Sequence, residues 1–104
     1  MKYVNICGIP HNVIYAQDVF NTDLHLGQID YQKCEILLNS EIPKELKDEV
    51  LCHEIVHGIL MHIGYDELSN DEKFVQQLGN AINQTFAIRI REQYPANKRS
   101  ETFA

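Results

Sequence analysis

The spacing of the apolar residues changes near Pro43, and this change divides the 104-residue chain into two kinds of structure. Before Pro43, short apolar segments alternate with turn residues, as in β-strands. After it, apolar residues recur every three or four positions, as in amphipathic helices. A chain of this length supports one hydrophobic core. We therefore predict a single α+β domain over residues 1–94.

Four strands are expected in the first half, because each segment is short, rich in strand-forming residues and close to a turn signal. One such signal is Gly8-Ile9-Pro10. The run Ile36-Leu37-Leu38 favours a strand covered on both faces. Tight connections favour a small, mainly antiparallel sheet with room for one parallel pairing. The expected strands are residues 2–7, 12–19, 26–31 and 34–39.

Two helices are expected in the second half. The first begins at Pro43, a residue favoured in a first helical turn, and ends near Gly64. The second opens at Ser69, where Ser69 and Glu72 fit the capping-box pattern, and continues to about Tyr94. The predicted architecture is therefore a small twisted sheet packed on two successive helices.

Composition limits the partners and the compartment. The net charge of −6 disfavours nucleic acid and anionic membranes. No apolar run approaches the roughly 20 residues that a membrane-spanning helix needs, and residues 1–10 lack a signal peptide's apolar core. Three widely spaced cysteines, Cys7, Cys34 and Cys52, indicate free thiols in a reducing compartment. We expect a cytoplasmic protein whose polar tail, residues 95–104, is disordered.

The segment His53-Glu54-Ile55-Val56-His57 carries the chemistry. Histidines four positions apart on a helix share one face, where their ring nitrogens can meet one tetrahedral zinc ion. Glu54 points elsewhere, so it is expected to act on a metal-bound water as general base. The alternative is an amphipathic helix that merely contains two histidines, whose buried ring nitrogens would then need other partners.

A third ligand is expected, since two histidines rarely hold zinc alone. His62 is unsuitable because it lies five positions after His57, about 140° around the helix. Glu72 is preferred because it shares a side with Val75, although the capping box gives it another possible role. Asp71 is the second candidate, since it lies nearer the centre of the apolar face. The acids considered are Asp66, Glu67, Asp71 and Glu72.

Four other residues have weaker predicted roles. Tyr65 follows the end of the first helix and is expected to pack rather than to donate to a reaction intermediate. His11 and His25 are expected at the surface of the sheet region. Gly58 is interpreted as a position where another backbone approaches the helix closely.

The motifs together resemble a known family. They are Leu26-Gly27-Gln28-Ile29-Asp30-Tyr31, Leu51-Cys52-His53-Glu54-Ile55-Val56-His57-Gly58-Ile59 and Asp71-Glu72-Lys73-Phe74-Val75. In this order they resemble the small phage and prophage proteins of the HExxH class and, more distantly, the ImmA/IrrE-like metallopeptidases. The resemblance implies a minimal zincin fold, in which a small sheet packs on the HExxH helix and a second helix supplies a Glu ligand.

The resemblance also implies a function. The matching positions make His53, His57 and Glu72 zinc ligands and Glu54 the general base of a metallopeptidase. The substrate would be a peptide or a regulatory protein in the cytoplasm, that of the host cell if the protein is phage-encoded. An edge strand would bind extended peptide, and residues 34–39 are the expected strand. The alternative is a zinc-stabilised protein-binding module of phage origin with little or no catalytic activity.

Overall fold

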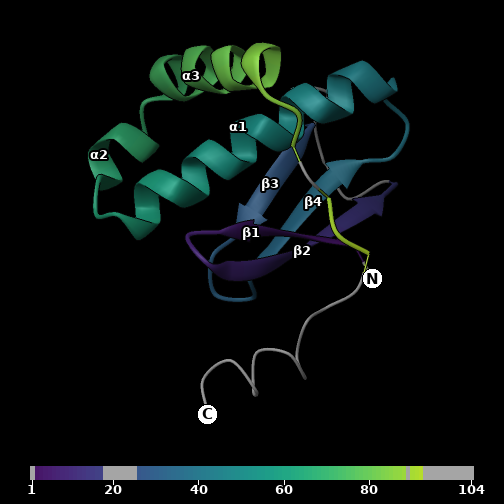
Figure 1. Ribbon diagram of the computed structural model, residues 1–104, viewed down its shortest axis with the longest axis horizontal. Coiled ribbons are helices and arrows are strands. Elements are labelled where there is room, and N and C mark those ends of the chain that lie inside the picture. Colours follow the sequence, from purple (N-terminus) through teal and green to yellow (C-terminus); the bar gives the residue numbers. More distant parts are fainter. Residues whose placement is uncertain (1, 18–25, 89, 93–104) are drawn as a thin grey trace.

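A computed structural model of the protein describes residues 2–17, 26–88 and 90–92 (Figure 1). Within these ranges the chain forms a four-stranded mixed sheet and three helices, which confirms the predicted α+β class. The elements are β1 (Tyr3–Ile6), β2 (Ile9–Ala16), β3 (Gly27–Asp30), β4 (Glu35–Asn39), α1 (Lys44–His62), α2 (Asp66–Ser69) and α3 (Glu72–Thr85). The predicted tail, like His25, lies outside the described residues.

The strand order is β1-β2-β4-β3. β1 pairs with β2 and β3 with β4 in antiparallel register, while β2 and β4 are parallel. The prediction that residues 34–39 form an edge strand is wrong, because β4 is hydrogen-bonded to a strand on each side. Within the described ranges, β3 has a strand neighbour on one side only, so it forms one edge of the sheet. At the other edge, Tyr3 and Arg91 exchange two backbone hydrogen bonds of 2.8 Å.

The turn between β1 and β2 lies one residue earlier than predicted. Cys7 and Gly8 occupy it with φ angles of 51° and 82°, and Ile9 and Pro10 already belong to β2. Two successive residues with positive φ make the tight two-residue hairpin loop whose twist matches that of the strands. Pro10 is tolerated in β2 because it lies at the start of the strand.

One face of the sheet packs on α1, and α3 packs on the opposite side of α1 (Figure 1). The core between the sheet and α1 consists of Val4, Ile6, Val13, Ile36, Leu38, Leu51 and Ile55. A second cluster between α1 and α3 consists of Val56, Leu60 and Val75. The helix that carries His53 and His57 is therefore held on two sides. None of the helices in the described ranges is long and apolar enough to span a bilayer.

His11 is buried, so its predicted surface position is wrong. It pairs with Val4 on the sheet face that packs on α1, and its Nδ1 donates to the carbonyl oxygen of Ile9 at 2.8 Å. Its ring also lies edge-on to that of His62 near the end of α1, with 6.0 Å between the ring centroids. Burial in the core lowers the pKa of His11, which favours the neutral ring.

The second helix is shorter than predicted. The chain forms the short α2 and then starts α3 at Glu72, with Asp71 as the N-cap: its carboxylate accepts from the backbone N–H of Phe74 at 3.1 Å. The capping box between Ser69 and Glu72 is therefore absent. α3 ends at Thr85 rather than near Tyr94.

The chain leaves α3 at Phe86, which is extended with φ −125° and ψ 156°. Ile88 and Ile90 then pack against the core between the sheet and α1, and the segment reaches β1 at Arg91. Helical periodicity predicted a longer helix because it depends only on the spacing of apolar residues and carries no information on which surface they bury. Here, burial against the sheet overrides the local preference.

Two glycines of the helices mark close approaches. A Cβ on Gly58 would lie 3.0 Å from methyl groups of Ile6 and Ile29, so side chains of the sheet, rather than a backbone, approach at this position. A Cβ on Gly79 would lie 3.2 Å from the Cα and 3.3 Å from the backbone nitrogen of His53. The close backbone approach predicted at Gly58 therefore occurs at Gly79, where α3 crosses α1.

We expect Gly79→Ala to destabilise the protein. Helix propensity alone favours Ala over Gly by about 1 kcal/mol, but the new methyl would press on the backbone of α1. Such overpacking costs about 1–3 kcal/mol, so urea unfolding should show a net loss of stability. Gln77→Ala on the exposed face of α3 serves as the control. A Gly79→Ala protein more stable than wild type would contradict the close crossing.

Candidate metal centre

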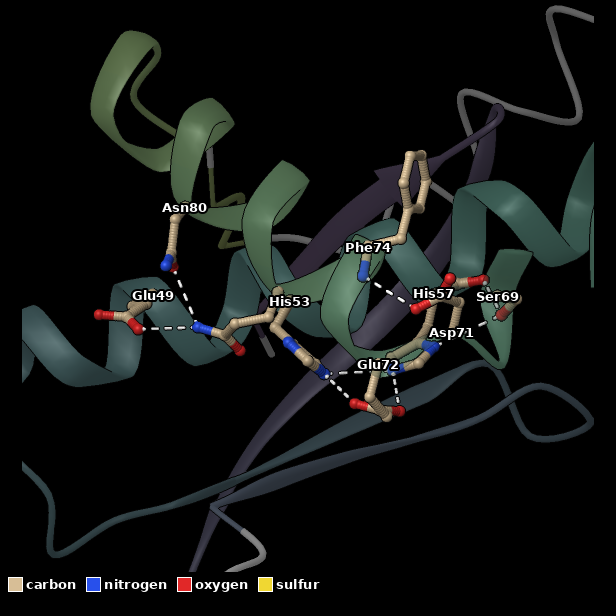
Figure 2. A network of polar contacts seen from close by, with 9 residues as sticks. Glu49, His53, His57, Ser69, Asp71, Glu72, Phe74 and Asn80 are labelled. Atoms are coloured by element: carbon tan, nitrogen blue, oxygen red, sulfur yellow. Dashed lines mark hydrogen bonds and ion pairs between the residues drawn. The ribbon is translucent and has the colours of Figure 1, made fainter. Parts of the chain in front are cut away.

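His53 and His57 lie one turn apart on α1 and point to the same side (Figure 2). Their Nε2 atoms are 3.2 Å apart, and both side chains are mostly buried. The spacing of four residues, which predicted a shared face, therefore places both ring nitrogens at one point.

Glu72 brings a carboxylate from α3 to the same point (Figure 2). Its Oε2 lies 3.0 Å from Nε2 of His53, and its Oε1 lies 3.0 Å from Nε2 of His57. Among the residues that the structure describes, this is the group of three or more His, Cys, Asp or Glu side chains whose ligand atoms converge, all within 4.8 Å of one another. The side chain of Glu72 is 68% exposed, so the group opens to solvent on the side of α3.

The geometry of the three side chains fits a tetrahedral cation. Ligands about 2.0–2.1 Å from a zinc ion lie about 3.3 Å from one another in a tetrahedral site. The two ring nitrogens are 3.2 Å apart, and each lies 3.0 Å from a different oxygen of Glu72. Three such ligands also leave a fourth position for water.

When Glu72 is ionised, protons on the two ring nitrogens cannot satisfy all three contacts. Each Nε2 carries either one proton or one lone pair. If both nitrogens donate to Glu72, the 3.2 Å contact between them joins two donors; if one does not, its 3.0 Å contact with the carboxylate joins two lone pairs. While Glu72 is ionised, one of the three contacts is therefore repulsive whichever ring nitrogens carry protons. A cation bound by all three groups removes the conflict.

Ser69, at the end of α2, holds the ring of His57 from behind. Its hydroxyl lies 3.4 Å from Nδ1 of His57 and donates to the backbone oxygen of the same residue at 3.2 Å. In the tautomer that donates from Nδ1 to Ser69, the lone pair of Nε2 faces His53 and Glu72. Burial is the main influence on the pKa of His57 and lowers it, which keeps the ring neutral and able to bind a metal.

Glu54 is 7% exposed and borders the same cleft as the histidines. Burial raises the pKa of its carboxyl to about 7, and the negative charge of Glu72 adds to the rise. A carboxyl with this proton affinity can both accept and release a proton near neutral pH. Glu54 thus lines the cleft together with the candidate ligands but does not belong to the converging group.

The cleft has a volume of about 620 Å³ and lies between the β3 edge, α1 and α3. Its wall on the β3 side includes residues 26–29 and Tyr31, none of which was predicted as part of the site. At α3, the Gln76 amide donates to Glu49 and to Asn80 at 3.1 Å each (Figure 2). The contact between Gln76 and Glu49 joins residues 27 positions apart in sequence, so it leaves no periodic signal.

The other residues considered from the sequence lie away from the histidines. Asp71, the second candidate for the third ligand, directs its carboxylate to the N-terminus of α3. Asp66, Glu67 and His62 are exposed and do not belong to the converging group. Tyr65 is 56% exposed and does not border the cleft, so the packing role expected for it is wrong.

The three cysteines are free thiols, as the sequence predicted. Cys52 is buried beside His53 in sequence, but its Sγ donates to Oδ1 of Asn83 at 3.8 Å. Burial raises the pKa of this thiol to about 11, which disfavours the thiolate that metal binding requires.

Comparison with protein-family models gives no match. Searches of curated proteins and of solved structures give none either. The case for the site therefore depends on its own geometry.

We expect Ser69→Ala to weaken zinc binding by about 10–100-fold, the usual effect of removing a group that orients a ligand. Zinc affinity measured by competition with a chelating dye provides the test. Ser40→Ala is the control, because the Ser40 hydroxyl is buried and has no hydrogen-bond partner among the described residues. Equal affinities for the two variants would show that Ser69 does not position His57.

Substitutions of the neighbouring acids Asp71 and Glu72 should have different effects on stability and on zinc binding. Asp71→Ala removes the N-cap of α3 and should lower the stability of the zinc-free protein by about 1 kcal/mol while leaving zinc stoichiometry intact. Glu72→Gln should have little effect on the stability of the zinc-free protein. It should instead lower the zinc affinity, and by more than Ser69→Ala does. Thermal unfolding and metal analysis of both variants test this. Zinc loss in Asp71→Ala alone would reverse the ligand assignment.

Proposed function

We propose that the protein is a zinc-dependent peptidase. The observation that carries this proposal is the buried Glu54 carboxyl beside three converging ligand groups, at the wall of an open cleft. A purely structural metal site has no use for such a carboxyl. The resemblance of the HExxH segment to the small phage metallopeptidases supports the same assignment.

In this proposal His53, His57 and Glu72 hold the ion. Zinc, when bound, polarises the scissile carbonyl and lowers the pKa of the attacking water. Glu54 takes a proton from that water as its oxygen attacks the carbonyl carbon. The same carboxyl then delivers the proton to the leaving amine nitrogen. The mostly buried positions of the two histidines keep their rings fixed during these steps.

A peptide is the proposed substrate because the cleft is bordered by a strand edge. Residues 27–29 of β3 line the cleft, and β3 pairs with β4 on its other side. An extended peptide can add to such an edge through backbone hydrogen bonds, which places its carbonyl groups along the cleft. This assigns to β3 the role that the sequence-based prediction gave to β4.

We expect Glu54→Gln to keep about one zinc per chain and to lower peptide hydrolysis by at least about 100-fold, because the proton carrier is lost. Cleavage of a mixed peptide library, followed by mass spectrometry, supplies the substrate and the rate. Glu49→Gln is the matched control: it removes the same charge from α1 and from the same cleft, and its side chain can still accept from Gln76. Equal activity of Glu54→Gln and wild type would contradict the role of Glu54.

A second candidate function is a protein-binding module in which zinc is structural. The observation that favours it is that the ligands come from two helices, so a bound ion would join α1 to α3 in a small domain. This function predicts one zinc per chain, a large drop in melting temperature on chelation, and no cleavage of any library peptide by wild type. The peptidase proposal predicts cleavage that disappears with Glu54→Gln.

A further inference from the structure

Tyr31 lines the cleft that holds the candidate metal centre. It directly follows β3, and its side chain lines the same cleft as His53, Glu54, His57 and Glu72. It is 38% exposed, so the ring stands in the cleft wall rather than in the core. No role was predicted for it, since Tyr65 was the tyrosine considered from the sequence.

The surroundings of Tyr31 connect it to the candidate metal centre. Partial burial is the largest influence on its pKa and raises it, a contact with the Ser69 side chain lowers it, and the charges of Glu54 and Glu72 raise it further. Ser69 in turn contacts His57. A phenol is protonated at neutral pH even at its ordinary pKa of about 10, so Tyr31 is able to donate a hydrogen bond.

The backbone at Tyr31 is fixed by the turn that it begins. The Asp30 carboxylate accepts hydrogen bonds from the backbone N–H groups of Gln32 and Lys33 at 3.0 and 2.9 Å. Such an Asx-type arrangement holds the turn from its first residue. The ring therefore leaves the edge strand at a defined point, next to the segment that borders the cleft.

The other residues around the cleft are poorly suited to donate to a reacting carbonyl. The two histidines direct their Nε2 atoms to each other and to Glu72, and both Glu side chains are acceptors when ionised. Gln76 is engaged with Glu49 and Asn80. Gln28 also lines the cleft, but it alternates with Gly27 and Ile29, which contact residues of α1, so its side chain is directed away from α1. Asn70 and Tyr31 remain, and Tyr31 is the one with a contact to Ser69.

We propose that Tyr31 is a catalytic residue whose phenol donates a hydrogen bond to the scissile carbonyl oxygen as negative charge develops there. This inference rests on the proposed peptidase function. The bond from the water oxygen to the carbonyl carbon forms, the C=O π pair moves to oxygen, and Glu54 takes the water proton. The pair then returns, the C–N bond breaks, and the Glu54 proton goes to nitrogen. Tyr31 keeps its own proton throughout.

The test is Tyr31→Phe, which removes the hydroxyl and keeps the ring. With a peptide found in the library search, we expect kcat to fall by about 100-fold, the usual effect of losing one donor to an oxyanion, with KM little changed. A second measurement needs no turnover: a phosphinic peptide, which mimics the tetrahedral anion, should bind the variant about 100-fold more weakly by calorimetry. Zinc affinity should remain that of wild type.

Two control variants make the result decisive. Tyr65→Phe should change none of these quantities, because Tyr65 is outside the cleft. Asn70→Ala tests the competing donor, and a loss of kcat and phosphinate affinity in that variant instead of Tyr31→Phe would overturn the proposal. Zinc loss in Tyr31→Phe would also overturn it, by showing a structural role. Wild-type protein that holds zinc but cleaves no peptide would refute the peptidase function itself, whereas equal activity of Tyr31→Phe and active wild type refutes only the role of Tyr31.

Discussion

The close crossing of α1 and α3 is the constraint on which the candidate metal centre depends. Gly79 allows the two helices to approach at the backbone of His53, and Val75 packs with Val56 and Leu60 near the same crossing. With the helices fixed in this way, the first turn of α3 lies over the histidine face of α1. Glu72 can then reach both ring nitrogens, because Asp71 serves as the cap and leaves it free.

The candidate centre combines burial with unbalanced polar contacts. The histidines are mostly buried, and Glu54 is buried beside them. The contact between the two Nε2 atoms and their contacts with an ionised Glu72 cannot all be favourable without a cation. Burial lowers the pKa of His57 and raises that of Glu54, so both side chains are biased toward their neutral forms. Neutral histidine is the form that binds a metal, and a carboxyl with a raised pKa is suited to carrying a proton.

The sheet determines the side from which the proposed peptide would reach the candidate metal centre. The two edges of the sheet differ: β1 exchanges backbone hydrogen bonds with Arg91, whereas the cleft runs along β3. The proposed peptide would therefore enter on the side where Tyr31 and the candidate metal centre lie together. The residues after α3 contribute to this asymmetry, because Ile88 and Ile90 pack against the core and Arg91 pairs with β1.

The sequence by itself determined the features that depend on spacing within one element. Histidines four residues apart had to share a face of α1, and the change of period at Pro43 predicted the α+β class. Only the tertiary structure brought Glu72 rather than Asp71 to the two histidines, made β3 rather than β4 the edge strand, and placed Tyr31 rather than Tyr65 at the cleft. Periodicity determines how side chains are oriented around one helix or strand, whereas contacts between elements depend on which surfaces the whole chain buries. For the same reason, the length of α3 and the burial of His11 could not be predicted from the local sequence pattern.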